Sequence, residues 1–228
     1  MSISVSTPIN SGEKHIAVVL LVDTSTSMME KPIDELNKGL QEFGEALRED
    51  SLAMGRSEVC VVSFNDTVRV EHEFSPATEY VPPELCAGGL TCLIEAINIS
   101  LDIFEERKKL YTEIGIDYYR PWLFVLTDGV PTDIEKEKQV MTRLKTAIGE
   151  NKVVYMPMGI GENAKIEKLQ EYYPDDVTKK VVLKATASNF KEAFVWLSRS
   201  VAAILESDAR PNSSVLLPPT PSIISVGV

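Results

Sequence analysis

Four short, almost wholly apolar runs place the strongest limit on how this chain of 228 residues folds. They cover residues 16–22, 59–64, 122–126 and 153–160, and they are rich in Val, Leu and Phe. Runs of this length without a polar face are typical of strands that are covered on both faces of a sheet. The sequence therefore predicts a buried, mostly parallel sheet.

Segments with the 3.6-residue period of an amphipathic helix separate and follow these runs. Apolar positions share one helical face in residues 33–47, 93–104, 140–148 and 190–204. Residues 67–74 instead alternate apolar and polar side chains, which predicts an antiparallel edge strand. The order of elements predicts an α/β fold, doubly wound and Rossmann-like, with one antiparallel edge strand and helices on both faces of the sheet.

Oxygen-bearing side chains follow the first and third of the predicted central strands, and a further one follows a glycine pair. Because doubly wound sheets bind ligands beyond the carboxyl ends of their strands, these three segments are expected to meet at one point. Carboxylate and hydroxyl oxygens suit Mg²⁺, and Mn²⁺ and Ca²⁺ accept similar sites. The predicted metal ligands are Asp23, Ser25, Ser27, Thr91 and Asp128.

These three segments read DxSxS, GGxT and TDG, and in this order they resemble the metal-ion-dependent adhesion site of von Willebrand factor type A domains. The resemblance extends over residues 15–206. It implies that the serines and Thr91 bind the ion directly or nearly so, and that the aspartates act partly through water. It also implies a non-enzymatic, Mg²⁺-dependent protein-interaction module whose ion takes a Glu or Asp side chain from a protein partner.

Four further stretches resemble the bacterial cytoplasmic branch of that family, which is associated with tellurium-resistance and stress gene clusters. The resemblance implies a signalling partner, either a serine/threonine kinase or a PP2C-type phosphatase. The stretches are residues 64–68, 80–83, 119–122 and 127–133.

Composition limits the partners and the location. The chain carries 34 acidic and 23 basic residues, a formal net charge of −11, which repels nucleic acid and anionic lipid. The chain has no apolar run of the ~18 residues that a membrane span needs, and residues 2–15 lack the pattern of a signal peptide. These features predict a cytoplasmic protein that binds neither nucleic acid nor membrane.

The chain is expected to form one domain with two tails: a polar N-terminal tail (1–14), the domain itself (15–206) and a Pro-rich, apolar C-terminal tail (207–228). The C-terminal tail is either disordered or an extended strand on this domain or on a partner. Cys86 and Cys92 flank Thr91, so a redox role and a plain buried thiol are both open.

The enzymatic alternative is a haloacid-dehalogenase-like phosphotransferase with Asp23 as its nucleophile. Such phosphatases carry a second acid two residues later, where this chain has Ser25, and the sequence therefore favours a non-enzyme. Thr132 and Glu135 predict a capping box for the following helix. Asp133 lies near the same rim but is expected to serve a helix dipole.

Overall fold

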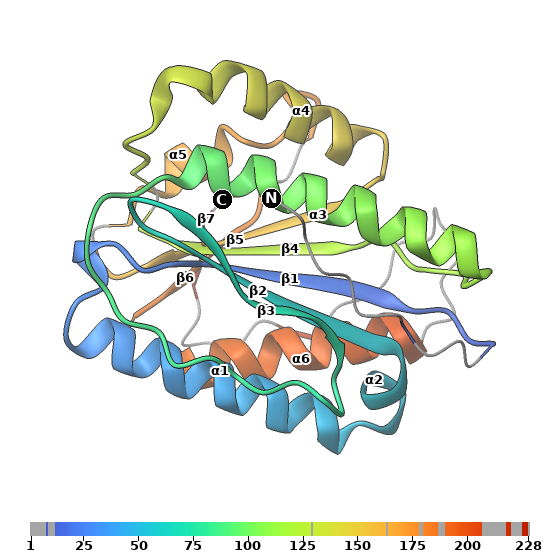
Figure 1. Cartoon of the computed structure of the whole chain (residues 1–228). Helices are drawn as coiled ribbons and strands as arrows, with labels where there is room; N and C mark the ends of the chain where they lie inside the picture. The colour runs from blue at the N-terminus through green and yellow to red at the C-terminus, as the bar shows by residue number, and fades with distance from the viewer. Residues whose placement is uncertain are drawn as a thin grey trace.

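The computed structural model describes residues 8, 12–128, 130–162, 164–177, 180–186, 190–206, 218–219 and 225–227. In this part of the chain, seven strands form one sheet in the order β3-β2-β1-β4-β5-β6-β7 (Figure 1). The strands are β1 (Ile16–Asp23), β2 (Ser57–Phe64), β3 (Val68–Pro76), β4 (Trp122–Thr127), β5 (Val154–Ile160), β6 (Val182–Ala185) and β7 (Ser225–Gly227).

Helices cover both faces of this sheet (Figure 1). Helices α1, α2 and α6 lie on one face, and α3, α4 and α5 lie on the other. The α-helices are α1 (Lys31–Glu49), α2 (Ser51–Arg56), α3 (Leu93–Ile114), α4 (Glu137–Gly149), α5 (Ile166–Gln170) and α6 (Phe190–Glu206), and two short 3₁₀ helices are η1 (Thr26–Met28) and η2 (Ile134–Lys136).

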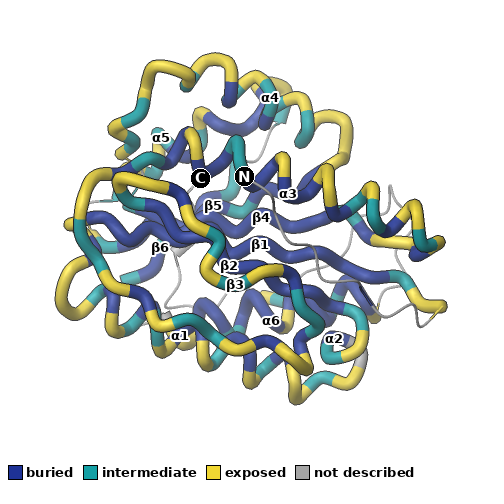
Figure 2. Tube along the Cα trace, in the orientation of Figure 1, coloured by how far each residue is buried: buried dark blue, intermediate teal, exposed yellow. Residues whose placement is uncertain are grey.

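Strand β1 separates two hydrophobic cores because its side chains alternate between the two faces of the sheet. Val18 and Leu20 pack in the core beneath α1 and α6, whereas Val19 and Leu21 pack beneath α3 and α4. All eight residues of β1 are buried, and Figure 2 shows the buried strands between helices whose outer faces are exposed. The apolar run of residues 16–22 is thus explained by contacts on both sides.

The predicted fold class is confirmed. Strands β1, β2, β4, β5 and β6 run parallel to one another, and β3 pairs antiparallel with β2 at one edge, as the alternation in residues 67–74 predicts. One feature differs from the prediction of a single antiparallel edge strand, because β7 pairs antiparallel with β6 at the other edge. Residues 225–227 of the C-terminal tail therefore join this domain's own sheet.

Most of the two predicted tails lies outside the described residues. In the N-terminal tail, these are residues 1–7 and 9–11. The described N-terminal part of the domain begins with His15, whose backbone N–H donates a hydrogen bond to the Asp117 carbonyl (2.9 Å). Strand β6 is not predicted by the sequence, because four residues are too few to show a pattern.

The position of β1 decides where the candidate site lies. The chain adds β2 on one side of β1 and β4 on the other, and both pair with it in parallel, so that Val22 faces Ser63 on one side and Leu126 on the other. The strand order reverses at this point, and doubly wound sheets bind their ligands beyond the carboxyl ends of the strands at such a reversal. Loops that follow these two strands therefore meet.

Candidate metal centre

Asp23 is the last residue of β1, and its side chain is fully buried. The Ser25 backbone N–H donates a hydrogen bond to Asp23 Oδ1 (2.8 Å), and the Thr127 hydroxyl donates one to Asp23 Oδ2 (2.6 Å). Both carboxylate oxygens therefore have fixed positions. Thr127 ends β4, so this contact also joins the two central strands at the edge where they finish.

The chain turns sharply after β1. Thr24 anchors the turn to the neighbouring strand, because its backbone N–H and its hydroxyl both donate to the Phe64 carbonyl (2.9 and 3.1 Å). The 3₁₀ turn that follows brings the hydroxyls of Ser25 and Ser27 to 3.0 Å from each other. Ser25 is buried and Ser27 is exposed. This hydroxyl pair thus leads from the buried carboxylate of Asp23 to the surface.

The second loop is hydrogen-bonded to the first. The Gly89 carbonyl accepts hydrogen bonds from the backbone N–H and the hydroxyl of Thr26 (3.0 and 2.8 Å). Gly89 has φ +85°, and a Cβ on it would lie 2.0 Å from an Asp66 carboxylate oxygen. A side chain here would be strained in this left-handed conformation and would displace the Asp66 carboxylate, so glycine is favoured. The hydrogen bonds between Thr26 and Gly89 thus hold the loop of Thr91, which is buried, next to the turn that carries Ser25 and Ser27.

The third loop follows β4 and is paired with the second. The Thr132 backbone N–H donates to the Thr91 carbonyl (2.9 Å), and the Thr91 backbone N–H donates to the Thr132 hydroxyl (3.1 Å). Asp128 directly follows β4 and is half-buried. Its carboxylate accepts a hydrogen bond from the Val130 N–H (3.3 Å), and its carbonyl accepts one from the Lys165 N–H (2.7 Å).

The predicted capping box is wrong. The Thr132 hydroxyl binds the Thr91 N–H instead of capping its own helix, and neither η2 nor α4 has a side-chain cap. Asp133 has a different role from the predicted one as well, because its carboxylate accepts the backbone N–H groups of Ile94 and Glu95 (3.1 and 2.8 Å). It thereby caps α3, the helix that begins just after Thr91.

Burial dominates the electrostatics of Asp23. The pKa of this carboxyl is raised to about 6: burial raises it most, the hydrogen bonds from Ser25 and Thr127 oppose the rise, and the nearby charge of Asp128 adds to it. Within the described residues, no Lys, Arg or His forms an ion pair with Asp23. A cation beside two neighbouring carboxylates would offset their repulsion and stabilise their charged forms.

The structure places all five predicted ligands on three loops that are hydrogen-bonded to one another, at the end of the sheet where β1 and β4 finish. Their two carboxylates and three hydroxyls are donors of the kind that Mg²⁺ takes. Across the described part of the chain, no group of three or more His, Cys, Asp or Glu side chains is arranged to hold a metal. A centre at these loops would therefore depend on hydroxyl ligands, and metal binding itself stays a prediction.

Sequence reasoning missed the residues that position the ligands. Thr127 fixes Asp23, Thr24 fixes the first turn, and Thr132 fixes Thr91. The position of Thr127 immediately before Asp128 is the one signal that sequence offered for it. The other contacts join residues about 40 positions apart, which no local pattern reveals.

The two cysteines near Thr91 differ in exposure, and both are free. Cys86 is exposed, whereas Cys92 is half-buried and its thiol lies 3.5 Å from the Asp66 carbonyl. Burial raises the pKa of Cys92, and the neighbouring carboxylates of Asp133, Glu95 and Asp66 raise it further. Because the thiolate is the reactive form, this environment does not favour redox chemistry at Cys92.

Comparison with solved structures identifies the architecture. A von Willebrand factor type A protein from Catenulispora acidiphila superimposes with a TM-score of 0.61 at 16% identity, over 84% of this chain and 43% of that one. The fold is that of a von Willebrand factor type A domain. The VWA2 protein of Sulfolobus acidocaldarius, described as a paralogue of ArnB, gives a TM-score of 0.55 at 17% identity, over 80% of this chain and 44% of that one.

A third structure with this fold matches over nearly its whole length. The von Willebrand factor domain of the type V pili tip protein Mfa5 from Porphyromonas gingivalis has a TM-score of 0.60 at 10% identity, over 89% of this chain and 99% of that one. The chain spans less than half the length of the first two proteins. No protein-family model and no curated protein sequence matches it.

The described helices were compared with the requirements of a membrane span. None of them combines the length and the apolar character that crossing a bilayer requires.

Proposed function

We propose that this chain is a non-enzymatic protein-interaction module that binds an acidic side chain of a partner through a divalent cation, with Mg²⁺ as the favoured ion and Mn²⁺ or Ca²⁺ as alternatives. The observation that carries the proposal is the buried carboxylate of Asp23 at the strand-order reversal, with Asp128 beside it and the Ser25–Ser27 hydroxyl pair above it. The von Willebrand factor type A fold supports it.

The ligand set explains how such a module would bind an acid. Ser25, Ser27 and Thr91 contribute uncharged oxygens, so a bound ion keeps much of its positive charge. Asp23 and Asp128 contribute the charge that retains the ion, directly or through water. Ser27 is exposed while Asp23 is buried, so a partner side chain could approach this site from the side of Ser27. When bound, the ion would supply electrostatic attraction for a Glu or Asp carboxylate.

The sequence around Asp23 also bears on the enzymatic alternative. That alternative uses the Asp23 carboxylate as a nucleophile. Haloacid-dehalogenase-like phosphatases carry a second acid two residues after the nucleophile, where this chain has Ser25. This difference in sequence favours metal binding over phosphoryl transfer.

A narrower proposal concerns the biological setting. The resemblance of four short stretches to the tellurium-resistance-associated branch supports a bacterial, cytoplasmic stress-signalling role. It also supports a serine/threonine kinase or a PP2C-type phosphatase as the partner.

Calorimetry with Mg²⁺ and Mn²⁺ on the purified chain tests the metal site directly. We expect saturable uptake of one ion by the wild type and its loss in Asp23→Ala. Because removal of a buried group can perturb folding, Ser27→Ala is the second variant. Ser27 is exposed, and we expect its loss to weaken the affinity about tenfold or more. Asp175→Ala, at a highly exposed surface ion pair, is the control.

A pull-down from native lysate tests the contact with a partner. Proteins retained by the wild type in Mg²⁺ should be lost in EDTA and with Ser27→Ala, but kept with Asp175→Ala. Retention of the same proteins under all of these conditions would contradict a metal-dependent contact, and absence of Mg²⁺ and Mn²⁺ uptake at millimolar concentrations would contradict the metal site itself.

A further inference from the structure

Exposed hydrophobic side chains gather around the candidate metal centre. Six large hydrophobic residues are exposed within the described part of the chain, and four of them lie on the loops that carry or directly follow the candidate ligands. Isolated exposed hydrophobic residues are ordinary, but a group at one place marks an interaction surface. The four are Met29 (51% exposed), Leu90 (58%), Val130 (46%) and Ile134 (62%).

Hydrogen bonds hold the first two of these residues near each other. The Met29 backbone N–H donates to the Thr26 carbonyl (3.1 Å), and the Thr26 hydroxyl donates to the carbonyl of Gly89 (2.8 Å). Gly89 directly precedes Leu90. Met29 and Leu90 therefore extend from two loops that are joined beside the Ser25–Ser27 pair.

The other two residues lie on the third loop. Leu90 directly precedes Thr91, which makes two hydrogen bonds with Thr132. Ile134 follows Thr132 by two residues, and Val130 precedes it by two. The four apolar side chains thus belong to three joined loops at one end of the domain, and we call them the apolar collar.

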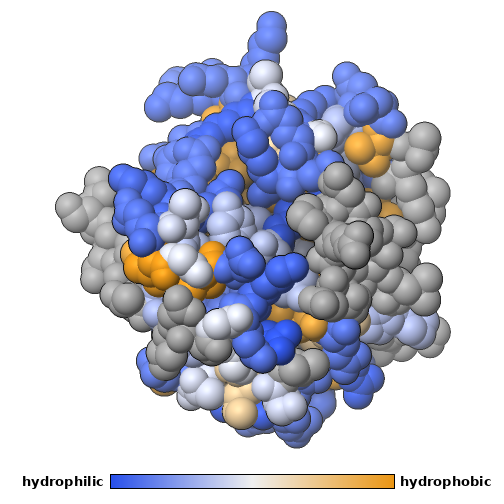
Figure 3. Space-filling view, turned by 90° about the vertical axis from the view of Figure 1, so that its right-hand side faces the viewer, coloured by the Kyte–Doolittle hydropathy of each residue, from blue (hydrophilic) through white to orange (hydrophobic). Residues whose placement is uncertain are grey.

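The two remaining exposed hydrophobic residues do not extend this collar. Tyr118 lies at the opposite end of the sheet, where it pairs with His15 and stacks on Tyr111 with a ring separation of 5.4 Å. Val81 directly follows Tyr80, whose carbonyl accepts a hydrogen bond from Arg48 in the last turn of α1, away from the end of that helix that follows the serine turn. Figure 3 shows that opposite end, where hydrophilic residues predominate and hydrophobic patches are separate. The collar is therefore specific to the end with the candidate ligands.

Charge around the collar limits its partner further. Glu30 is exposed next to Met29, and Asp66, also exposed, accepts the Leu90 N–H (3.1 Å). The whole chain carries a net charge of −11. These acidic side chains would repel a polyacidic segment. A segment with a single carboxylate would place its one charge on the bound ion and keep its other side chains uncharged.

We propose that the partner segment carries one acidic side chain flanked by apolar residues, and that Met29, Leu90, Val130 and Ile134 contact those apolar neighbours. This inference rests on the proposed function, because the carboxylate is held by the ion. It adds the chemistry of the surrounding sequence: apolar contacts that exclude water around the ion contact and select among acidic segments.

Selection from a display library of random dodecapeptides on immobilised protein, with Mg²⁺ or with EDTA, tests the inference. Peptides enriched only with Mg²⁺ should share one Asp or Glu with apolar residues within two positions of it. Enrichment of polyacidic or hydrophilic sequences, or no Mg²⁺-dependent enrichment, would overturn the proposed collar contact.

Variants separate the collar from the metal centre. The double variant Leu90→Ser/Ile134→Ser should bind the best selected peptide about tenfold or more weakly than the wild type, while its Mg²⁺ uptake in calorimetry persists. Val81→Ser, a loss of an equally exposed hydrophobic residue elsewhere, should bind that peptide as the wild type does. Equal peptide affinity in the double variant and the wild type would refute the collar contact alone.

Two other results have distinct meanings. Absence of Mg²⁺ uptake by the wild type would refute the proposed function together with this inference. Concentration-dependent dimers in analytical ultracentrifugation that disappear in the double variant would assign the collar to a second copy of this chain, and would overturn the proposed partner.

Discussion

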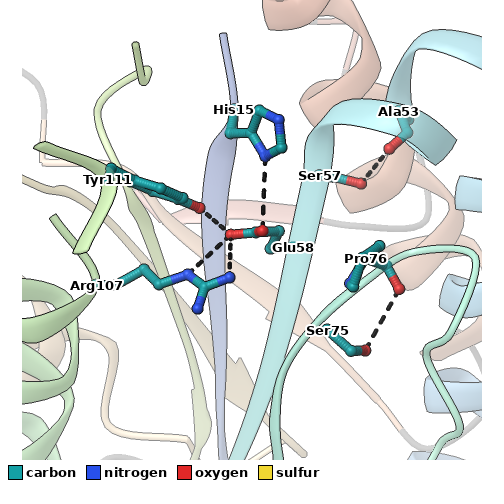
Figure 4. Close-up of polar contacts among 8 residues, drawn as sticks. All are labelled: His15, Ala53, Ser57, Glu58, Ser75, Pro76, Arg107 and Tyr111. Atoms are coloured by element: carbon teal, nitrogen blue, oxygen red, sulfur yellow. Dashed lines mark hydrogen bonds and ion pairs between the residues drawn. The ribbon is translucent and has the colours of Figure 1, made fainter. Parts of the chain in front are cut away.

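A buried ionic cluster at the end of the sheet opposite the candidate metal centre gives a quantitative prediction about stability. Glu58, near the start of β2, and Arg107, on α3, are each 1% exposed. Arg107 Nη2 and Nε lie 2.7 and 2.9 Å from Glu58 Oε2. The Tyr111 hydroxyl donates to the same oxygen, and His15 Nδ1 lies 3.6 Å from Oε1 (Figure 4).

The substitution Glu58→Gln keeps the shape of this side chain and removes its charge. Arg107 would then remain buried without its counter-charge, for which the loss is about 3–5 kcal/mol. The glutamine carbonyl still accepts a hydrogen bond from Tyr111 or Arg107, so we expect about 3 kcal/mol, the lower end of that range. A domain with the usual stability of about 5–15 kcal/mol stays folded, and the loss is measurable by urea denaturation.

The double variant Glu58→Gln/Arg107→Met separates the pair from its surroundings. It removes both charges, so its loss should be smaller than the sum of the two single losses by about 1 kcal/mol or more. A loss under about 1 kcal/mol for Glu58→Gln, or strict additivity in this cycle, would refute the reasoning.

The same pair predicts how stability depends on pH. Burial alone would raise the pKa of Glu58, but His15, Arg107 and Tyr111 outweigh it and hold the pKa below its ordinary value of 4.5. The folded state therefore binds fewer protons at this site than the unfolded state, so its contribution is complete above pH 4.5 and is lost as the pH falls through the folded pKa. The wild type should lose stability on acidification more steeply than Glu58→Gln, and parallel curves would contradict this.

Two further predictions concern helix packing and the C-terminal strand. In Gly39→Ala the new Cβ would lie 2.3 Å from the Phe194 ring, so overpacking of about 1–3 kcal/mol exceeds the helix-propensity gain of about 1 kcal/mol, and the melting temperature should fall. Gly149→Ala meets no heavy atom within 4 Å and should instead gain up to about 1 kcal/mol, so shifts of the same sign in both variants would count against this. Deletion of residues 209–228 removes β7 and the Pro218 carbonyl, which accepts the Trp196 indole N–H (3.0 Å), and should destabilise the domain by about 1–3 kcal/mol in urea. Trp196→Phe leaves β7 in place but removes that hydrogen bond and part of the buried indole ring, and it should cost about 1–3 kcal/mol, whereas full stability of the deletion variant would show that β7 is passive.

The capping prediction shows where a local pattern misleads. Thr132 and Glu135 have the spacing of a capping box, yet the Thr132 hydroxyl binds the Thr91 N–H from a distant loop. A tertiary partner was available for that hydroxyl, and its contact took precedence over the local one. Asp133 likewise caps α3, which is distant in sequence, and not the helix that directly follows it.

The sequence by itself determined the elements whose patterns are local and long. The apolar runs of β1, β2, β4 and β5, and the helical stripes of α1, α3, α4 and α6, follow from burial on two faces or on one. The order of the three oxygen-bearing segments was also present in the sequence. Together with the parallel connections, it placed all five candidate ligands at the carboxyl ends of the strands.

Only the tertiary structure decided the strand order, the joining of β7 to β6, and the contacts that fix the candidate ligands. The Thr127–Asp23 hydrogen bond spans 104 residues, and the Glu58–Arg107 pair spans 49. Such contacts depend on which groups remain near one another after the chain has folded, and no periodicity encodes that distance. The apolar collar has the same origin, because Met29, Leu90, Val130 and Ile134 lie on three loops that hydrogen bonds join only after folding.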